Sequence, residues 1–336
     1  LAAGLLLDGG HSVVFRDGRI RDVQAGAGGN ATSGYGNAGA GGRAGAVLLR
    51  GGAFNVWIEG SELTDIKGGA AGDRGGNAGT VDATAGAAGG VHVVDGGGAR
   101  LLNGLVRDII GGVAKSDALD GHGACVLASS PGNIHVDGLT CVGSGADHQH
   151  GAWIEGHYDG PVLVLNAIFS GLSGYGLANH GANDPSLLLA RYSLFDEGSA
   201  LGNDDSGAVS NAVLGEGCLL GPPGFVDATL HDYRLAQGTP GIDAGDPDGD
   251  YELEPVPNGC RRNMGAYGGT ELATAQDGAA NCFGHSVHCL EDQQACDGVC
   301  RNVLDDAAHC GGCGIFCDSV NKTVTGVCKA GQCGQV

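Results

Sequence analysis

The most constraining feature of this chain is a unit of about 23 residues that recurs along most of its length. Each copy has an opening glycine, an apolar strand, a polar corner with glycine, a second apolar strand, a third short strand and a glycine exit. One clear copy is GAVLLRGGAFNVWIEGSELTDIKGG, which starts at Gly45. The copies open at Gly4, Gly45, Gly90, Gly123, Gly151, Gly176 and Gly207, and the last is shorter. Such a repeat is typical of a stack of similar coils.

Three short strands per unit, joined by corners of Gly, Asn, Asp and Ser, predict an all-β solenoid. In that fold, each coil buries its inward side chains against the coils above and below. A β-sandwich of unrelated hairpins is the alternative. Its turn signals would recur roughly every 8–12 residues without a longer period. The longer period seen here favours the solenoid.

Extra residues enter the repeat at one point, directly after the third strand, at about 27–44, 70–89 and 113–122. Insertions at one point of a solenoid unit project from one edge, so we expect them to lie side by side. The two longer ones are almost entirely Gly, Ala, Asn, Ser and Thr. They could be flexible loops. We favour ordered loops packed on one another, because neighbours of similar length and composition can satisfy each other's backbone hydrogen bonds.

Composition and charge exclude several classes of function. The formal net charge is −21, and the few lysines form no basic cluster, which excludes a nucleic-acid groove. No window of about 18 apolar residues could span a membrane. The chain has 13 cysteines, which fits an oxidising compartment. Because it opens at Leu1, we expect a mature form whose N-terminal segment has been removed, and we expect it to be secreted or at the cell surface.

Four segments follow one another near the end of the repeat region. They are Phe225 to Ala228 (FVDA), Asp232 to Leu235 (DYRL), Thr239 to Pro247 (TPGIDAGDP) and Asn263 to Thr270 (NMGAYGGT). In this order they resemble the closing coil and exit segment of bacterial right-handed parallel β-helix proteins, including those called choice-of-anchor Q domain proteins. The resemblance implies a right-handed parallel β-helix over residues 1–270 and export from the cell. It says little about activity.

After a linker at 271–281, residues 282–336 are rich in cysteine. The run resembles the small cysteine-rich modules of secreted proteins from myxobacteria and their relatives, with His309 where asparagine is usual. We expect eight cysteines to form four disulfides, in a pairing that the sequence leaves open: Cys289, Cys296, Cys300, Cys310, Cys313, Cys317, Cys328 and Cys333. Half a zinc site at Cys310 and Cys313 is the alternative.

Five cysteines precede these eight. We also assign Cys125, Cys141, Cys218 and Cys260 to disulfides. The total is odd, so one thiol is left over, and Cys282 in the cysteine-rich region is our candidate for an unpaired or intermolecular cysteine.

A run of carboxylates lies in the exit segment: Asp243, Asp246, Asp248, Asp250, Glu252 and Glu254. Closely spaced carboxylates on a loop are the ligands that calcium prefers, and we name the first five as candidate calcium ligands. The loop is not an EF-hand, because Tyr251 stands where the invariant glycine belongs. A solvated acidic turn is the alternative. The fold requires no cofactor, so calcium is the one cofactor that we consider.

Histidines gather in the middle of the repeat: His122, His148, His150, His157 and His180. Aligning the units puts His122 and His150 at the same position, so we expect them to stack on neighbouring coils. With Asp204 and Asp205, and with Asp147 and Glu155 nearby in the unit, they are the candidate catalytic residues. A polar ladder at solenoid corners is the alternative.

Parallel β-helices include polygalacturonases and pectate lyases. Polygalacturonases present N-T-D, D-D, G-H-G and R-I-K in that order. Here Gly121-His122-Gly123 precedes Asp204-Asp205, and R-I-K is missing. The sequence thus favours a non-catalytic protein.

The leading prediction is a secreted or cell-surface structural and adhesive β-solenoid. Its expected partners are other copies of itself, joined head to tail into a filament, and a polysaccharide or cell surface. A polysaccharide-active lyase or glycoside hydrolase and a non-catalytic glycan-binding module are the alternatives.

Overall fold

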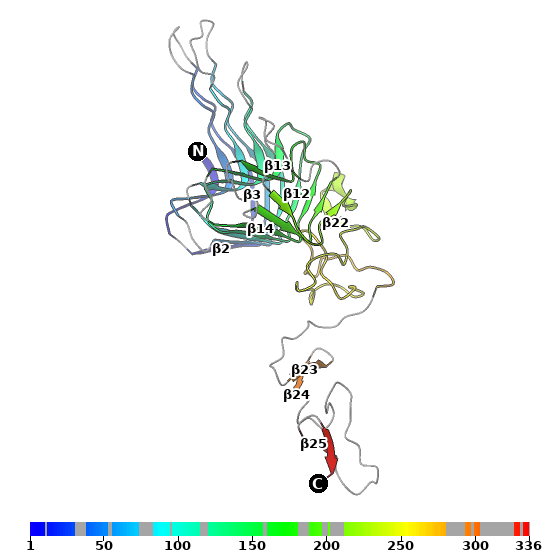
Figure 1. Ribbon diagram of the computed structural model, residues 1–336. Coiled ribbons are helices and arrows are strands. Elements are labelled where there is room, and N and C mark those ends of the chain that lie inside the picture. Colours follow the sequence, from blue (N-terminus) through cyan, green and yellow to red (C-terminus); the bar gives the residue numbers. More distant parts are fainter. Residues whose placement is uncertain are drawn as a thin grey trace.

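The computed structural model describes residues 1–10, 12–30, 38–52, 56–73, 83–94, 96–114, 120–156, 160–180, 188–196, 201, 212–279, 293–296, 299–302, 326–329 and 332–335. Within these ranges the repeat folds into a right-handed parallel β-helix (Figure 1). Every strand of the repeat pairs in parallel with the equivalent strand of the next coil. The predicted fold class is therefore confirmed.

Three parallel sheets make up the coils, with one strand from each coil in each sheet. Sheet A contains β1 (Ala2–Asp8), β4 (Ala44–Arg50), β7 (Ala88–Val94), β10 (Gly123–Ser129), β13 (Gln149–Glu155) and β16 (Leu177–His180). Sheet B contains β2 (Val13–Arg16), β5 (Val56–Glu59), β8 (Ala99–Leu102), β11 (Ile134–Asp137), β14 (Val162–Leu165), β17 (Leu188–Arg191) and β19 (Ala212–Leu214). Sheet C contains β3 (Arg19–Gln24), β6 (Glu62–Lys67), β9 (Leu105–Ile110), β12 (Thr140–Val142), β15 (Ile168–Ser170), β18 (Leu194–Phe195) and β20 (Leu219–Leu220).

Inward side chains of the three sheets form continuous apolar rows along the axis. In sheet B, for example, Ile58 aligns with Leu101 and then with Val136, and all three are buried. In sheet C the rings of Phe169 and Phe195 stack with their centroids 4.9 Å apart. Alternation of apolar and polar residues along each short strand produces these rows, because successive side chains point to opposite faces.

Sheets B and C meet at a corner that needs a left-handed residue in each coil. Asp17, Asn103 and Asn166 occupy this position with φ near 50°, Gly60 and Gly138 take it in two other coils, and Tyr192 is an exception with φ 47°. Asp, Asn and Gly tolerate this conformation better than other residues do. The corner composition that marked the repeat therefore has a backbone cause.

The segment after the last coil lies along this corner. It contains β21 (Phe225–Asp227), the 3₁₀ turn η2 (Ala228–Leu230) and β22 (Asp232–Leu235), followed by irregular chain to residue 279. Arg262 forms an ion pair with Asp137 of the fourth coil at 3.1 Å. Asn103 donates to the carbonyl of Ala266 at 3.0 Å, and Asn166 accepts from the backbone N–H of Asp246 at 2.6 Å. The exit segment thus covers several coils from outside.

In the C-terminal region the structure describes two short antiparallel hairpins. They are β23 (Gln293–Cys296) with β24 (Val299–Asn302), and β25 (Gly326–Lys329) with β26 (Gln332–Gln335).

Candidate functional site

The glycine-rich insertions leave sheet C and return to sheet A as extended limbs that run side by side (Figure 1). The described outgoing limbs are 25–30, 67–73 and 110–114, and the returning limbs are 38–43, 83–87 and 120–122. We call these six limbs the glycine array. Residues at the three insertion tips, 31–37, 74–82 and 115–119, lie outside the described residues.

Each limb of the glycine array hydrogen bonds to neighbours in more than one direction. The N–H of Gly28 donates to Ala70 of the next outgoing limb at 2.9 Å, and Gly69 donates to Gly42 of a returning limb at 2.8 Å. The bonds continue through Gly86 to Gly69 and through Gly112 to Gly86, both at 2.8 Å.

Backbone hydrogen bonds from the first outgoing limb to the second recur every third residue, from Ala25 to Lys67 and then from Gly28 to Ala70. That period belongs to an extended helix with three residues per turn. The described parts of the insertions are therefore ordered and packed on one another.

The limbs approach so closely that side chains do not fit between them. A Cβ atom on Gly28 would lie 1.8 Å from the carbonyl oxygen of Gly39, and one on Gly86 would lie 1.9 Å from that of Gly42. Gly29 points into open space, with nothing within 4 Å of its Cβ position. Glycine is thus required at most contact positions, which accounts for the composition of the insertions.

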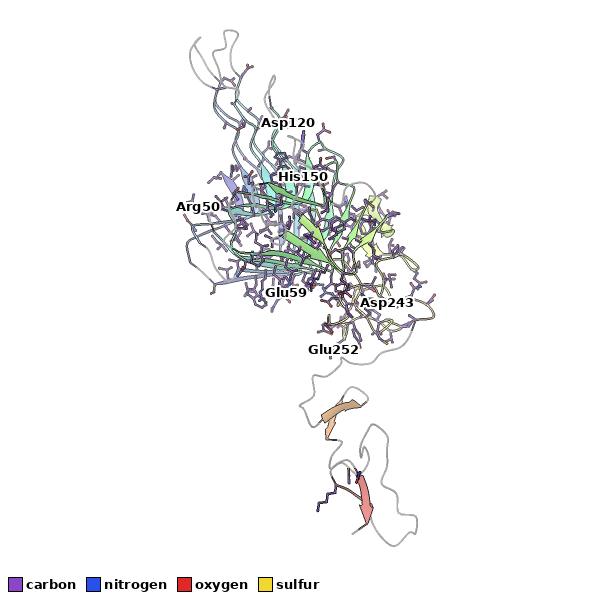
Figure 2. All side chains as sticks on the ribbon, viewed as in Figure 1. Arg50, Glu59, Asp120, His150, Asp243 and Glu252 are labelled. Atoms are coloured by element: carbon purple, nitrogen blue, oxygen red, sulfur yellow. A yellow bond between two sulfur atoms is a disulfide. The ribbon has the colours of Figure 1, made fainter. Side chains whose placement is uncertain are left out.

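Where the glycine array joins sheet A, the sheet bends sharply outward. At the bend, a Cβ on Gly45 would lie 3.1 Å from the Cβ of His92. The bend forms a cleft of about 380 Å³ that is lined by small residues of the array and by five polar residues. These polar residues are Arg43, Thr84, Asp120, His122 and Glu155. Figure 2 shows Asp120 and His150 near this end of the molecule.

The structure brings the predicted pair together: Nδ1 of His122 lies 3.2 Å from Nε2 of His150. Nδ1 of His150 accepts the backbone N–H of Tyr175 at 3.1 Å, so the proton of neutral His150 sits on Nε2. This Nε2–H donates to Nδ1 of His122, which leaves the proton of neutral His122 on its own Nε2. Both ring nitrogens of His122 are then committed, one as acceptor and one as donor. Neither is free to act as a general base.

Aromatic stacking fixes the pair further. The ring of His122 stacks on that of Trp153 with centroids 3.9 Å apart, and the ring of Tyr175 lies 5.7 Å from that of His150. Sequence comparison of the units missed Arg43, Trp153 and Tyr175. Their positions follow only from the bend of sheet A.

His92 lies beneath the cleft in the outward row of sheet A, aligned with Leu48 and Leu127, and is fully buried. Its Nδ1 donates to the carbonyl of Ala44 at 3.0 Å. Burial lowers the pKa of His92 to about 4, so the side chain is neutral near pH 7.

The other candidate catalytic residues do not complete a site. Glu155 accepts from the hydroxyl of Ser129 at 2.7 Å and lies 4.0 Å from Arg43. Asp204, Asp205 and His157 lie outside the described residues, as does the side chain of His180.

In the acidic loop, Asp246 and Asp250 accept the backbone N–H groups of Asp248 and Glu252, two residues further on, in tight local turns. Among the described residues, no group of three or more His, Cys, Asp or Glu side chains could hold a metal ion. Figure 2 shows Asp243 and Glu252 in the exit segment, away from His150. Calcium binding by the carboxylates named from the sequence stays a prediction, and calcium is not part of the function proposed below.

Glu254 has a structural role, because it joins two parts of the exit segment by hydrogen bonds. Its Oε1 accepts the backbone N–H groups of Asn263 and Gly269 at 2.8 and 2.6 Å. Glu254 is thus buried in the interior of the exit segment, and this burial raises its pKa to about 7.

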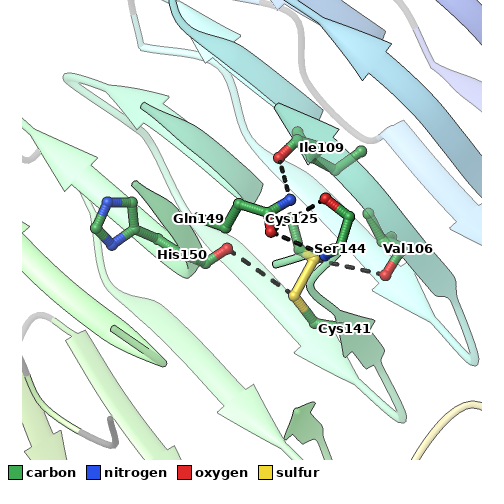
Figure 3. Close-up of a disulfide and its surroundings, with 7 residues drawn as sticks. All are labelled: Val106, Ile109, Cys125, Cys141, Ser144, Gln149 and His150. Carbon is green, nitrogen blue, oxygen red and sulfur yellow. Dashed lines mark hydrogen bonds between the residues drawn. A yellow bond between two sulfur atoms is a disulfide. The ribbon is translucent and has the colours of Figure 1, made fainter. Parts of the chain in front are cut away.

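A disulfide joins Cys125 of β10 to Cys141 of β12 across the core (Figure 3). Beside it, Gln149 donates to the carbonyl of Ile109 at 2.9 Å and accepts from Ser144 at 2.8 Å. Cys260 and Cys328 are also disulfide-bonded.

Cys218 corrects the sequence prediction, because it is a free thiol and not a disulfide partner. It donates to the carbonyl of Ala190 at 3.4 Å, while Cys125 and Cys141 of the coils are joined to each other. Cys282 and four cysteines of the module, Cys289, Cys310, Cys313 and Cys317, lie outside the described residues.

Comparison with known proteins gives one finding. Residues 270–331 match the model of the Stigma-specific STIG1-like protein family. The match spans the predicted linker and most of the cysteine-rich module, and includes none of the coils. Neither the curated proteins nor the solved structures contain a match. In the part of the chain that the structure describes, no helix is long and apolar enough to cross a membrane.

Proposed function

We propose that this protein is a secreted adhesive β-solenoid without catalytic activity, and that the glycine array is its rigid attachment edge. The observation that carries the proposal is the hydrogen bonding of the six limbs in several directions, with contacts that exclude any side chain. A cysteine-rich C-terminal region supports an oxidising, extracellular location.

Rigidity favours adhesion for an energetic reason. A loop that is ordered before contact loses little conformational entropy when it binds, whereas a flexible glycine loop loses more than any other segment. The hydrogen bonds of the array order the described limbs of three insertions at one edge of the solenoid. An extended, repetitive edge of this kind suits contact with a polymer or a surface.

The geometry of the histidine pair argues against catalysis at the cleft. The hydrogen bond from Tyr175 sets the tautomer of His150, which in turn sets that of His122. A polysaccharide lyase or hydrolase needs a group that accepts or donates a proton at the reacting atom. In this tautomer His122 has no free lone pair that could take a proton from a substrate, because its Nδ1 accepts from His150.

The experiment uses beads coated with the purified protein and surfaces coated with pectate, alginate, cellulose or chitin. We expect the beads to be retained on at least one polymer under flow, with no release of reducing or unsaturated sugar ends. Gly86→Ala, which disrupts the array, should lower retention, whereas Gly29→Ala should match the wild type. Release of sugar ends by the wild type, or no retention on any surface, would contradict the proposal.

Self-association stays a prediction. Light scattering of the purified protein at high concentration measures it directly, and a monodisperse monomer would contradict it.

A further inference from the structure

The outer face of sheet B carries a trough that no prediction from the sequence identified. Its volume is about 720 Å³, and its floor is the row of outward side chains Trp57, Arg100, His135 and Leu163. These four residues belong to β5, β8, β11 and β14, so the floor crosses four coils. Three spacings between parallel strands make a length of about 14 Å.

Arg100 is the distinctive residue of this floor. Its guanidinium group lies over the ring of Trp57, 5.0 Å from the ring centroid. Such a cation–π contact restrains the guanidinium group without using its N–H donors as hydrogen bonds to a carboxylate would.

The surroundings of Arg100 contrast with those of other arginines. Arg16 and Arg50 form close ion pairs with carboxylates of neighbouring coils. Arg100 forms none with any residue that the structure describes, and the described residues lining the trough include no carboxylate. In a protein with a net charge of −21, Arg100 is therefore a cation without a carboxylate partner among the residues that the structure describes. An unpaired, preoriented guanidinium is suited to a carboxylate.

The other groups of the floor suit a sugar chain. Trp57 is 36% exposed and offers an apolar surface, and Leu163 offers another two coils beyond Arg100. His135 lies beside Arg100 in the row, and burial lowers its pKa, so it is a neutral polar group near pH 7. Its Nε2 has no hydrogen-bond partner among the described residues. The row thus has an apolar group at each end and two hydrogen-bonding groups between them, which match the apolar faces and hydroxyl edges of a sugar chain.

We propose that this trough binds a carboxylate-bearing polysaccharide, with Arg100 holding a uronate carboxylate and Trp57 supporting an adjacent sugar ring. The inference goes beyond the proposed attachment edge, because it assigns a second binding surface to the adhesive protein. The site lies on sheet B and is separate from the cleft at the glycine array. An acidic peptide is the competing ligand that the test below separates.

Titration calorimetry with oligogalacturonate, its methyl ester and polyglutamate tests the proposal. We expect oligogalacturonate to bind, and esterification to weaken binding by about tenfold or more, because a charged hydrogen bond is lost. Arg100→Gln should abolish the preference for acid over ester. Trp57→Leu should weaken binding of both forms. Arg21→Gln, an exposed arginine of sheet C, is the matched control and should bind like the wild type.

Three outcomes would overturn the proposal: no binding of oligogalacturonate, an acid preference that survives in Arg100→Gln, or equal binding of polyglutamate. Thermal unfolding of each variant checks that it is folded. If Arg100→Gln binds like the wild type while coated beads still adhere to a polymer, the trough assignment fails and the adhesive function stands.

Discussion

His92 is a histidine that folding removes completely from water. Burial lowers its pKa from 6.5 to about 4, so the folded state prefers the neutral ring and the unfolded chain takes up a proton at higher pH. The contribution of neutral His92 to stability is therefore complete above about pH 6.5 and is lost as the pH falls toward 4. The shift corresponds to a loss of about 3 kcal/mol.

Urea unfolding of the wild type and of His92→Leu between pH 7 and pH 4 measures this loss. Leucine is chosen because Leu48 and Leu127 flank His92 in the same row. Over that range the wild type should lose about 3 kcal/mol more stability than the variant. Parallel pH profiles for the two proteins would show that His92 does not titrate as described.

At the scale of elements, the stability of the glycine array depends on having glycine at the positions where limbs touch, and not only on the total number of glycines. Gly86→Ala would place a Cβ 1.9 Å from a carbonyl oxygen, and we expect a loss of about 1–3 kcal/mol. Gly29→Ala removes a glycine of the same array but meets open space, so its effect should be near zero or slightly stabilising. Chemical unfolding compares the two, and equal losses would mean that the limbs are not packed as described.

For the whole molecule, an apolar cluster and several polar contacts attach the exit segment to the coils. Arg262 is 6% exposed and pairs with Asp137, so Arg262→Met should cost about 3 kcal/mol by leaving a partly buried carboxylate without its cation. Arg234 pairs with Asp232 in the open, and Arg234→Met should cost less than about 1 kcal/mol. Thermal unfolding ranks the two variants. Similar small losses would indicate that the exit segment is not held through Arg262.

The coils could be predicted from the sequence because their signals are local. The alternation of apolar residues along the strands and the small or polar residues at the corners recur with one period. The positions of the strands and of the insertions can therefore be predicted from the sequence. The contacts of Asn103 with Ala266 could not be predicted, since they join residues far apart in the chain. The local turns of the acidic loop, in which Asp246 and Asp250 accept backbone N–H groups, could not be predicted from the spacing of its carboxylates. The row from Trp57 to Leu163 becomes visible only when the register of sheet B is known.

The central claim is that the insertions form a rigid hydrogen-bonded array and not a set of loose loops. Amide hydrogen exchange at Gly28, Gly69, Gly86 and Gly112 tests it most directly, because each of these N–H groups donates to a neighbouring limb. We predict protection comparable with that of the strands of sheet A. Exchange at the rate of an unstructured peptide at these four amides would contradict the array and the adhesive edge built on it.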